Sequence, residues 1–235
     1  ITRDSKTQSF KIEGTGPESV TISCDDITTD CLYFRKFINI TLSHLKIETA
    51  KYGIYARELE SITLLNVHFS KCGSLGNLAD HDLSTTQEYQ QSVWSSARTS
   101  NGGCCRIRDI DSLNIQNCNI QYCLRGLRLQ DVHGNSERPS LVQNNKIFRC
   151  LESGIYLSSG LYQHDPSGVY GCHNIMVSNN YVIECYNNGL LSIGSRHCEF
   201  VKNVVRRSAN SGIQQWSSVD CSYSFNTLID TNIRP

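Results

Sequence analysis

The sequence lacks several features that would point to a familiar class of protein. Its 22 basic and 22 acidic side chains cancel to a formal net charge of zero, so the charge indicates neither a nucleic-acid-binding nor a membrane-surface protein. No apolar run approaches the length that spans a bilayer. A helical spacing of apolar residues is missing as well, which excludes helical solenoids and βαβ repeats.

The chain also lacks an initial methionine and a signal-like segment. It begins at Ile1 and stops at Pro235, directly after a complete repeat unit. We therefore expect a fragment or a processed piece of a longer protein.

What the sequence does contain is a repeat. The segment NNKIFRCLESGIYLS at 144–158 returns as NNYVIECYNNGLLSI at 179–193, with Asn, Cys and Gly in the same places. The intervals 185 to 208 and 208 to 231 are both 23 residues, and longer intervals equal one unit plus an insertion. Such a period predicts stacked repeats. The column aligned on cysteine is Ala50, Cys72, Cys123, Cys150, Cys185, Ser208 and Thr231.

Each unit contains three short apolar runs with a period of two, which is typical of β-strands. The sequence thus predicts an all-β fold, a right-handed parallel β-helix, built as a solenoid of about 23 residues and three short strands per coil. Equivalent strands would pair about 4.8 Å apart. We expect one domain over 1–235, with lead-in coils at 1–38, seven regular coils at 39–235, and insertions at about 73–101, 131–139 and 158–172.

The three recurring residues have structural explanations. Asn tolerates the left-handed backbone of a tight bend, and stacked amides hydrogen-bond along a ladder. Gly permits either a close backbone approach or a positive φ. Cysteine is a small, soft interior residue. The asparagines are Asn145, Asn180, Asn203 and Asn226, and the glycines are Gly53, Gly126, Gly154, Gly189 and Gly212.

With these residues the repeat resembles the pectin-lyase-like β-helix, which includes polysaccharide lyases, glycoside hydrolases and phage tailspikes. The resemblance covers most of the chain. It implies a carbohydrate-active fold and, for a tailspike-like protein, a homotrimer in a virion tail or outside the cell. The galacturonase signatures NTD, DD, GHG and RIK do not occur in that order, so no catalytic residue is carried over.

Twelve cysteines in a chain without helices raise the question of disulfides. Their repeat spacing places them in inward columns with parallel side chains, which disfavours bridges, so we expect free thiols and folding in a reducing compartment. No cluster has the spacing of metal ligands, and no cofactor is implied.

The three insertions all border the first strand of the coil, and long loops on one side of a rigid scaffold favour a binding groove there. Solenoids also tolerate insertions anywhere. The outward positions of that strand form two columns, Tyr55, Arg106, Arg128, Tyr156, Leu191 and Gln214, and then Arg57, Arg108, Gln130, Ser158, Ile193 and Trp216.

Aromatic rings that stack on sugars, beside guanidinium groups that grip carboxylates, suit an acidic polysaccharide. Arg and Tyr are also common on the solvent face of any sheet. Because these side chains point outward, we expect that replacing Arg128 or Tyr156 leaves stability unchanged. The candidate binding residues are Tyr55, Arg106, Arg128, Tyr156, Gln214 and Trp216.

Three further residues are candidates for catalysis. Asp109 and Asp131 share a column on adjacent coils if Ile107 and Leu129 are equivalent, and Asp111 then pairs with His133 in the same way. Two neighbouring carboxylates would push one pKa up and supply a general acid. Alternatively, Asp in turns hydrogen-bonds the local backbone. The catalytic candidates are Asp109, Asp131 and His133, with Glu152, His164 and Asp165 on bordering turns.

Two classes of function follow. In the first, the domain is the polysaccharide-active part of a tailspike-like or secreted enzyme, and it either binds or cleaves an acidic polysaccharide along the first-strand sheet. In the second, it is a non-enzymatic rod or partner-binding module of a larger assembly.

Overall fold

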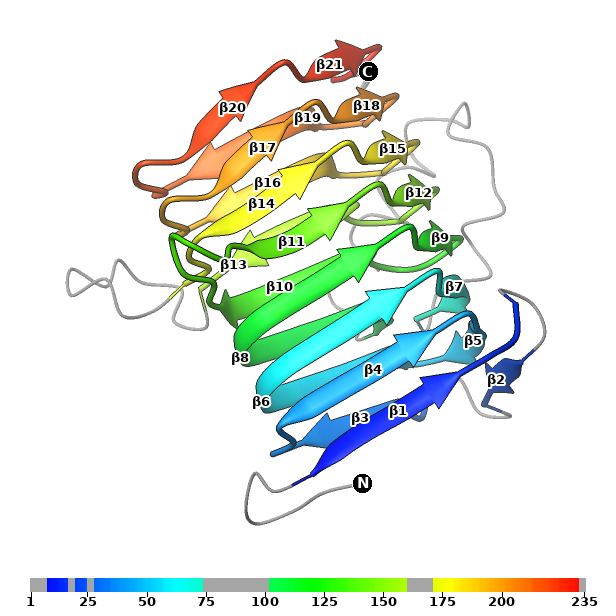
Figure 1. The fold of residues 1–235 in the computed structure, drawn as a ribbon. Helices are drawn as coiled ribbons and strands as arrows, with labels where there is room; N and C mark the ends of the chain where they lie inside the picture. Colours follow the sequence, from blue (N-terminus) through cyan, green and yellow to red (C-terminus); the bar gives the residue numbers. More distant parts are fainter. Residues whose placement is uncertain (1–7, 17–19, 25–27, 74–101, 160–170, 233–235) are drawn as a thin grey trace.

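The chain is a right-handed parallel β-helix, shown as a ribbon in Figure 1. The computed structural model describes residues 8–16, 20–24, 28–73, 102–159 and 171–232. Every strand pair in this part is parallel, and each strand pairs with its equivalent on the neighbouring coils, on one side only at the ends of the ladders. The prediction of fold class is confirmed.

The strands form three ladders along the solenoid axis. The first-strand ladder contains β3 (Leu32–Arg35), β6 (Tyr52–Leu65), β8 (Gly103–Gln116), β10 (Leu127–Val132), β13 (Ile155–Ser158), β16 (Asn188–Ile193) and β19 (Ser211–Trp216). The second-strand ladder contains β1 (Ser9–Glu13), β4 (Asn39–Ser43), parts of β6 and β8, β11 (Ser140–Gln143), β14 (Ile175–Ser178), β17 (Glu199–Val201) and β20 (Ser222–Ser224). The third-strand ladder contains β2 (Thr21–Ser23), β5 (Lys46–Ala50), β7 (His68–Cys72), β9 (Asn119–Gln121), β12 (Lys146–Phe148), β15 (Tyr181–Ile183), β18 (Val204–Arg206) and β21 (Thr227–Ile229).

In two coils the first and second strands are joined into one continuous strand. β6 and β8 each continue for 14 residues through the corner, where a single residue, Glu58 or Asp109, has a φ near +56° (57° and 55°). One left-handed residue turns the chain without breaking the ladder, and Leu59 still pairs with Ile110. For this reason the first two ladders belong to one 13-stranded sheet.

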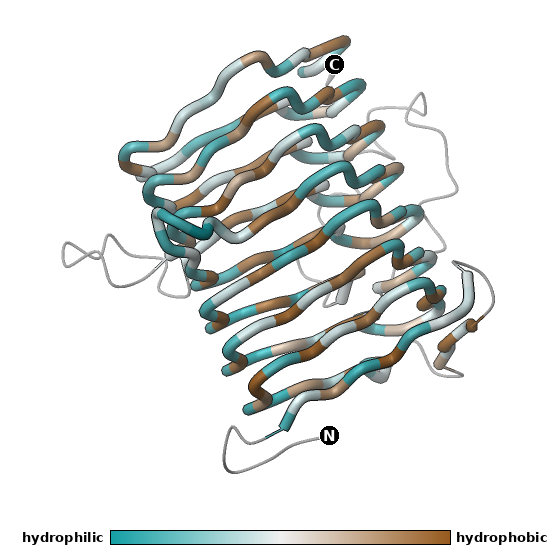
Figure 2. The backbone as a smooth tube through the Cα atoms, in the orientation of Figure 1, coloured by the Kyte–Doolittle hydropathy of each residue, from teal (hydrophilic) through white to brown (hydrophobic). Residues whose placement is uncertain are grey.

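Apolar side chains alternate with polar ones along the strands, as the hydropathy colouring of Figure 2 shows. The inward positions form one continuous core that extends from Phe34 to Val205. Ile40, Ile62, Ile107 and Phe200 are among its fully buried members. Each coil therefore contributes an inward layer that stacks on the layers of its neighbours.

The asparagine column forms the predicted ladder. Asn145 donates Nδ2 to Asn180 Oδ1 at 2.9 Å, Asn180 donates to Asn203 at 2.9 Å, and Asn203 donates to Asn226 at 3.0 Å. The left-handed backbone belongs to the preceding residue of each coil instead, for example Asn144 (φ 57°) and Phe225 (φ 55°). The expectation that the ladder asparagines themselves occupy the left-handed bend was wrong.

The glycine column is explained by close packing between coils. None of the five glycines in the column has a positive φ. A Cβ on Gly126 would lie 2.1 Å from the carbonyl oxygen of Gly154. A Cβ on Gly189 would lie 2.2 Å from Val205 Cγ1. Of the two reasons that the sequence left open, the structure supports the close backbone approach.

The cysteine column faces inward as predicted. Ala50, Cys72, Cys123, Cys150, Cys185 and Ser208 are all fully buried, and Ala50 pairs with Cys72 in the third-strand ladder. All twelve cysteines lie in the described part of the chain and are drawn as free thiols.

Candidate functional site

The outward face of the first-strand ladder, which we call the first face, carries the predicted columns in register. Tyr55 pairs with Arg106, Arg106 with Arg128, and Arg128 with Tyr156. The column continues through Leu191 to Gln214. The alignment of outward positions made from the repeat is therefore confirmed.

The first face begins one coil earlier than the sequence indicated. Tyr33 pairs with Tyr55, and Arg35 pairs with Arg57. Sequence reasoning missed Tyr33 and Arg35 because the segment 1–38 was not aligned with the repeat. The signal was present, since LYFR at 32–35 repeats the pattern of IYAR at 54–57.

Arginine and tyrosine side chains stack across neighbouring coils on this face. The guanidinium carbon of Arg106 lies 5.4 Å from the ring centroid of Tyr55, and that of Arg128 lies 5.6 Å from the centroid of Tyr156. Arg57 lies 5.9 Å from the centroid of Tyr33 and donates Nε to its hydroxyl at 2.9 Å. Such stacking holds each guanidinium flat and leaves its outer nitrogens as donors.

Most arginines near this face are neutralised by a carboxylate. Arg35 donates Nε to Glu58 at 3.1 Å, and Arg108 donates Nε to Asp109 at 2.9 Å. Although burial alone would lower the pKa of Arg108, its hydrogen bond to Asp109 raises that pKa above the usual value. These ion pairs hold the side chains in place, and the positive charge of each arginine is neutralised by its partner.

Arg106 and Arg128 differ from these neighbours. Neither makes a hydrogen bond or an ion pair within the described part of the chain, and the Nε atom of each is buried without an acceptor. Burial raises the pKa of Asp30. The positive charges of Lys51 and Arg106 partly oppose this rise, and Arg106 does so without a hydrogen bond to Asp30. Buried donors without partners are uncommon in folded proteins.

The catalytic candidates occupy the predicted column but have separate partners. The flanking pairs Gln130–Arg108 and Val132–Ile110 place Asp131 beside Asp109 in the ladder. Asp109 is bonded to Arg108. Asp131 is 6% exposed, and its Oδ1 accepts a hydrogen bond from the backbone nitrogen of Gly171 at 2.8 Å. This is a structural role toward the backbone, but the donor is 40 residues away in the chain rather than in the local turn that the sequence suggested.

His133 packs against another histidine. Its ring meets that of His173 edge to face, with centroids 5.2 Å apart and an interplanar angle of 77°. The two residues also form a parallel bridge between coils. His133 therefore lies at the corner where the first-strand and second-strand ladders meet.

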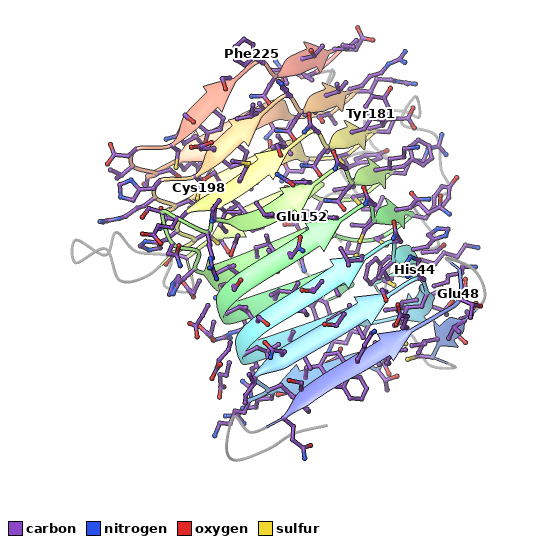
Figure 3. All side chains as sticks on the ribbon, in the orientation of Figure 1. His44, Glu48, Glu152, Tyr181, Cys198 and Phe225 are labelled. Atoms are coloured by element: carbon purple, nitrogen blue, oxygen red, sulfur yellow. The ribbon has the colours of Figure 1, made fainter. Side chains whose placement is uncertain are left out.

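Of the bordering candidates, only Glu152 lies in the described part of the chain. Glu152, which is labelled in Figure 3, forms an ion pair with Arg125, and both side chains are largely buried. His164, Asp165 and the insertion around 73–101 fall almost wholly outside the described residues. The described residues also contain no group of three or more His, Cys, Asp or Glu side chains that could hold a metal ion.

Gln214 and Trp216 lie at the far end of the face. Leu191, which is 7% exposed, separates Gln214 from Tyr156 in the column. Trp216 is 57% exposed on β19. The arginine and tyrosine side chains of the first face thus lie on the coils that carry Tyr33 to Tyr156, and Trp216 is an exposed aromatic side chain apart from them.

Comparison with known proteins supports the fold. The family model of the right-handed β-helix region matches residues 131–228, and the chain is similar to that family over this segment. No curated protein and no solved structure matches the chain. Within the described residues, no helix is long and apolar enough to cross a membrane.

Proposed function

We propose that the first face binds an acidic polysaccharide, with Arg106 and Arg128 gripping anionic groups on successive sugars. The observation that supports this most strongly is the pair of guanidiniums on adjacent coils, each stacked on a tyrosine and without a carboxylate partner among the described residues. Equivalent positions on adjacent coils lie about 4.8 Å apart, so the two cations form a repeating array that suits a ligand with regularly repeating anionic groups. A guanidinium fork matches the geometry of a carboxylate.

Tyrosine supplies the second part of this recognition. The rings of Tyr33 and Tyr55 lie 5.3 Å apart, and Tyr55 is partly exposed beside Arg106. An aromatic ring packs against the C–H face of a sugar while the neighbouring cation holds its acidic group. The combination favours an acidic glycan over a free anion.

Binding is better supported than cleavage. The two carboxylates that could act as acid or base have partners of their own, Arg108 and the backbone nitrogen of Gly171. An enzyme on this face would be a polysaccharide lyase or a glycoside hydrolase, and it would need a proton donor or acceptor within reach of the glycosidic bond or the sugar ring.

The test is titration of an oligouronate into the wild type and into Arg106→Ala, Arg128→Ala and Arg149→Ala variants. Arg149 is the matched control, because it is on the third-strand side and is already paired with Glu184 at 2.8 Å. We expect the first two replacements to weaken binding at least tenfold, which corresponds to about 1.4 kcal/mol, and the control to bind as the wild type does.

A neutral oligosaccharide of the same length and assays for reducing ends and unsaturated uronate complete the experiment. Arg128→Ala and Arg149→Ala variants with equal affinity would reject the binding site. The rod or partner-binding alternative would then be preferred, and it has its own supporting observation in the exposed apolar side chains of the last coil, among them Phe225 at 81%. Figure 3 shows Phe225 at the C-terminal end of the solenoid.

A further inference from the structure

A second concave surface lies on the outward side of the second-strand ladder. Its volume is about 900 Å³. One wall is the turn from Gly134 to Pro139, and the floor is made by β14, β17 and β20, which face the viewer in Figure 1. We call it the second-face groove. It is separate from the first face, because it lies on a different ladder.

The wall of this groove is held in place by hydrogen bonds. Asn135 Oδ1 accepts from the backbone nitrogens of Glu137 and Arg138, at 3.1 and 2.6 Å. Asn174 donates Nδ2 to the carbonyl oxygen of Gly134 at 3.1 Å, and Gly134 donates its backbone N–H to His173. The concave shape is therefore formed before any ligand arrives.

The groove carries two carboxylates, those of Glu199 and Asp220. Glu199 on β17 makes no hydrogen bond or ion pair with the described residues. Asp220 on the next coil has one partner, His197, whose Nδ1 lies 3.8 Å from Asp220 Oδ2, and both side chains are more than half exposed. No lysine or arginine is among the described lining residues.

The apolar part of the floor complements these carboxylates. Met176 lies next to Glu199 in the ladder, and Pro139 borders the groove from the turn. Lysine and arginine bury their methylene stems along such surfaces while their charged ends stay with acceptors. A flexible thioether adapts to the shape of the stem.

We propose that the second-face groove binds a lysine or arginine side chain of an extended basic peptide segment. Glu199 and Asp220 receive the cation, and Met176 packs against its stem. The proposal does not depend on the first face, and the two surfaces have opposite polarity. An acidic polysaccharide would be repelled from the second-face groove, and a basic peptide would be repelled by Arg106 and Arg128.

The single methionine of the chain gives a direct probe, because a sample labelled with ¹³C at the methionine methyl group shows one signal, that of Met176. The ligand is the hexapeptide amide Lys-Gly-Lys-Gly-Lys-Gly. We expect saturable movement of this signal, an affinity that falls as salt rises, and no movement with the matching glutamate peptide or a glycine–serine peptide.

Two double variants separate the site from the overall charge. Glu199→Gln with Asp220→Asn removes both acceptors and should weaken binding at least tenfold. Glu60→Gln with Asp230→Asn changes the net charge equally at exposed positions on other parts of the solenoid, and should bind as the wild type does. The proposal is overturned if the Met176 signal is unaffected by the lysine peptide, if the two double variants bind alike, or if the neutral peptide binds equally well.

Discussion

Arg128 lies over the ring of Tyr156 on the following coil, with 5.6 Å between its guanidinium carbon and the ring centroid. The two residues share a face but not an environment. Tyr156 is only 8% exposed, whereas Arg128 is partly exposed. The exposure of Tyr156 that we expected from the sequence is therefore contradicted, because outward direction on a strand does not ensure exposure, and we now expect Tyr156 to contribute to stability.

Tyr156→Ala should therefore destabilise the protein by about 3 kcal/mol, since truncating a buried aromatic side chain leaves a cavity. Tyr156→Phe keeps the ring and should cost about 1 kcal/mol at most. Arg128→Ala should change the free energy of unfolding by about 0.5 kcal/mol or less. Urea unfolding of the three variants measures these values, and equal midpoints for Tyr156→Ala and Arg128→Ala would contradict the burial of Tyr156.

The asparagine ladder should be a major source of cohesion between coils. The Asn180 side chain accepts from Asn145 N and Nδ2, at 3.0 and 2.9 Å, and donates to Val142 O and Asn203 Oδ1, at 2.8 and 2.9 Å. Asn180→Ala leaves several buried groups unsatisfied, and we expect a loss of about 3 kcal/mol or more.

Asn180→Asp tests whether donation is essential. It keeps the acceptor but replaces the donor with a second oxygen that faces Val142 O and Asn203 Oδ1, so at neutral pH it should be at least as damaging as Asn180→Ala. Lys202→Ala, at the exposed bend beside Asn203, serves as control. If Lys202→Ala lowered the melting temperature as much as the Asn180 variants do, the asparagine ladder would not be a major source of stability.

Cys150 tests the inward column. Burial and its neighbour Cys185 leave no room for a larger group, so Cys150→Phe should overpack the core and cost about 1 to 3 kcal/mol. Cys150→Ala should be mild, at about 1 kcal/mol, because Ala50 occupies the same column. A Cys150→Phe protein that unfolds at the same denaturant concentration as the wild type would show that the column does not face inward.

Cys221 should be the first thiol to react in the native protein. A hydrogen bond with Cys198 lowers the pKa of the partly exposed Cys221 to about 7, against the opposing effect of burial, and raises that of Cys198. Burial raises the pKa of Cys31 to about 12. Because the thiolate is the reactive form, alkylation of Cys221 should increase as the pH rises through about 7, while Cys31 stays largely unmodified.

Peptide mapping by mass spectrometry after brief alkylation follows both sites. Cys198→Ala removes the hydrogen bond and should shift the pH profile of Cys221 upward, whereas Cys118→Ala, at a cysteine buried elsewhere in the core, should not. A profile that is unchanged by Cys198→Ala would rule out the pairing. Twelve thiols should titrate after unfolding without reductant, and a much lower number would indicate disulfides.

The repeat by itself determined the architecture and the direction of most side chains. A 23-residue unit with inward Cys150 and Cys185 and laddered Asn145 and Asn180 has one way to bury its apolar positions, which is to stack each coil on the next. Stacking then fixes the register, so Tyr55, Arg106, Arg128 and Tyr156 could be aligned without coordinates.

Only the tertiary structure decided which of these side chains are free to act. Whether Asp131 serves as an acid depends on Gly171, which is 40 residues away in the chain, and whether an arginine is neutralised depends on bends such as those at Glu58 and Asp109. The second-face groove joins a turn at 134–139 to residues on three later coils. Periodicity specifies the direction in which a side chain leaves the backbone, but its partners come from neighbouring coils and irregular turns, whose conformations the repeat does not encode.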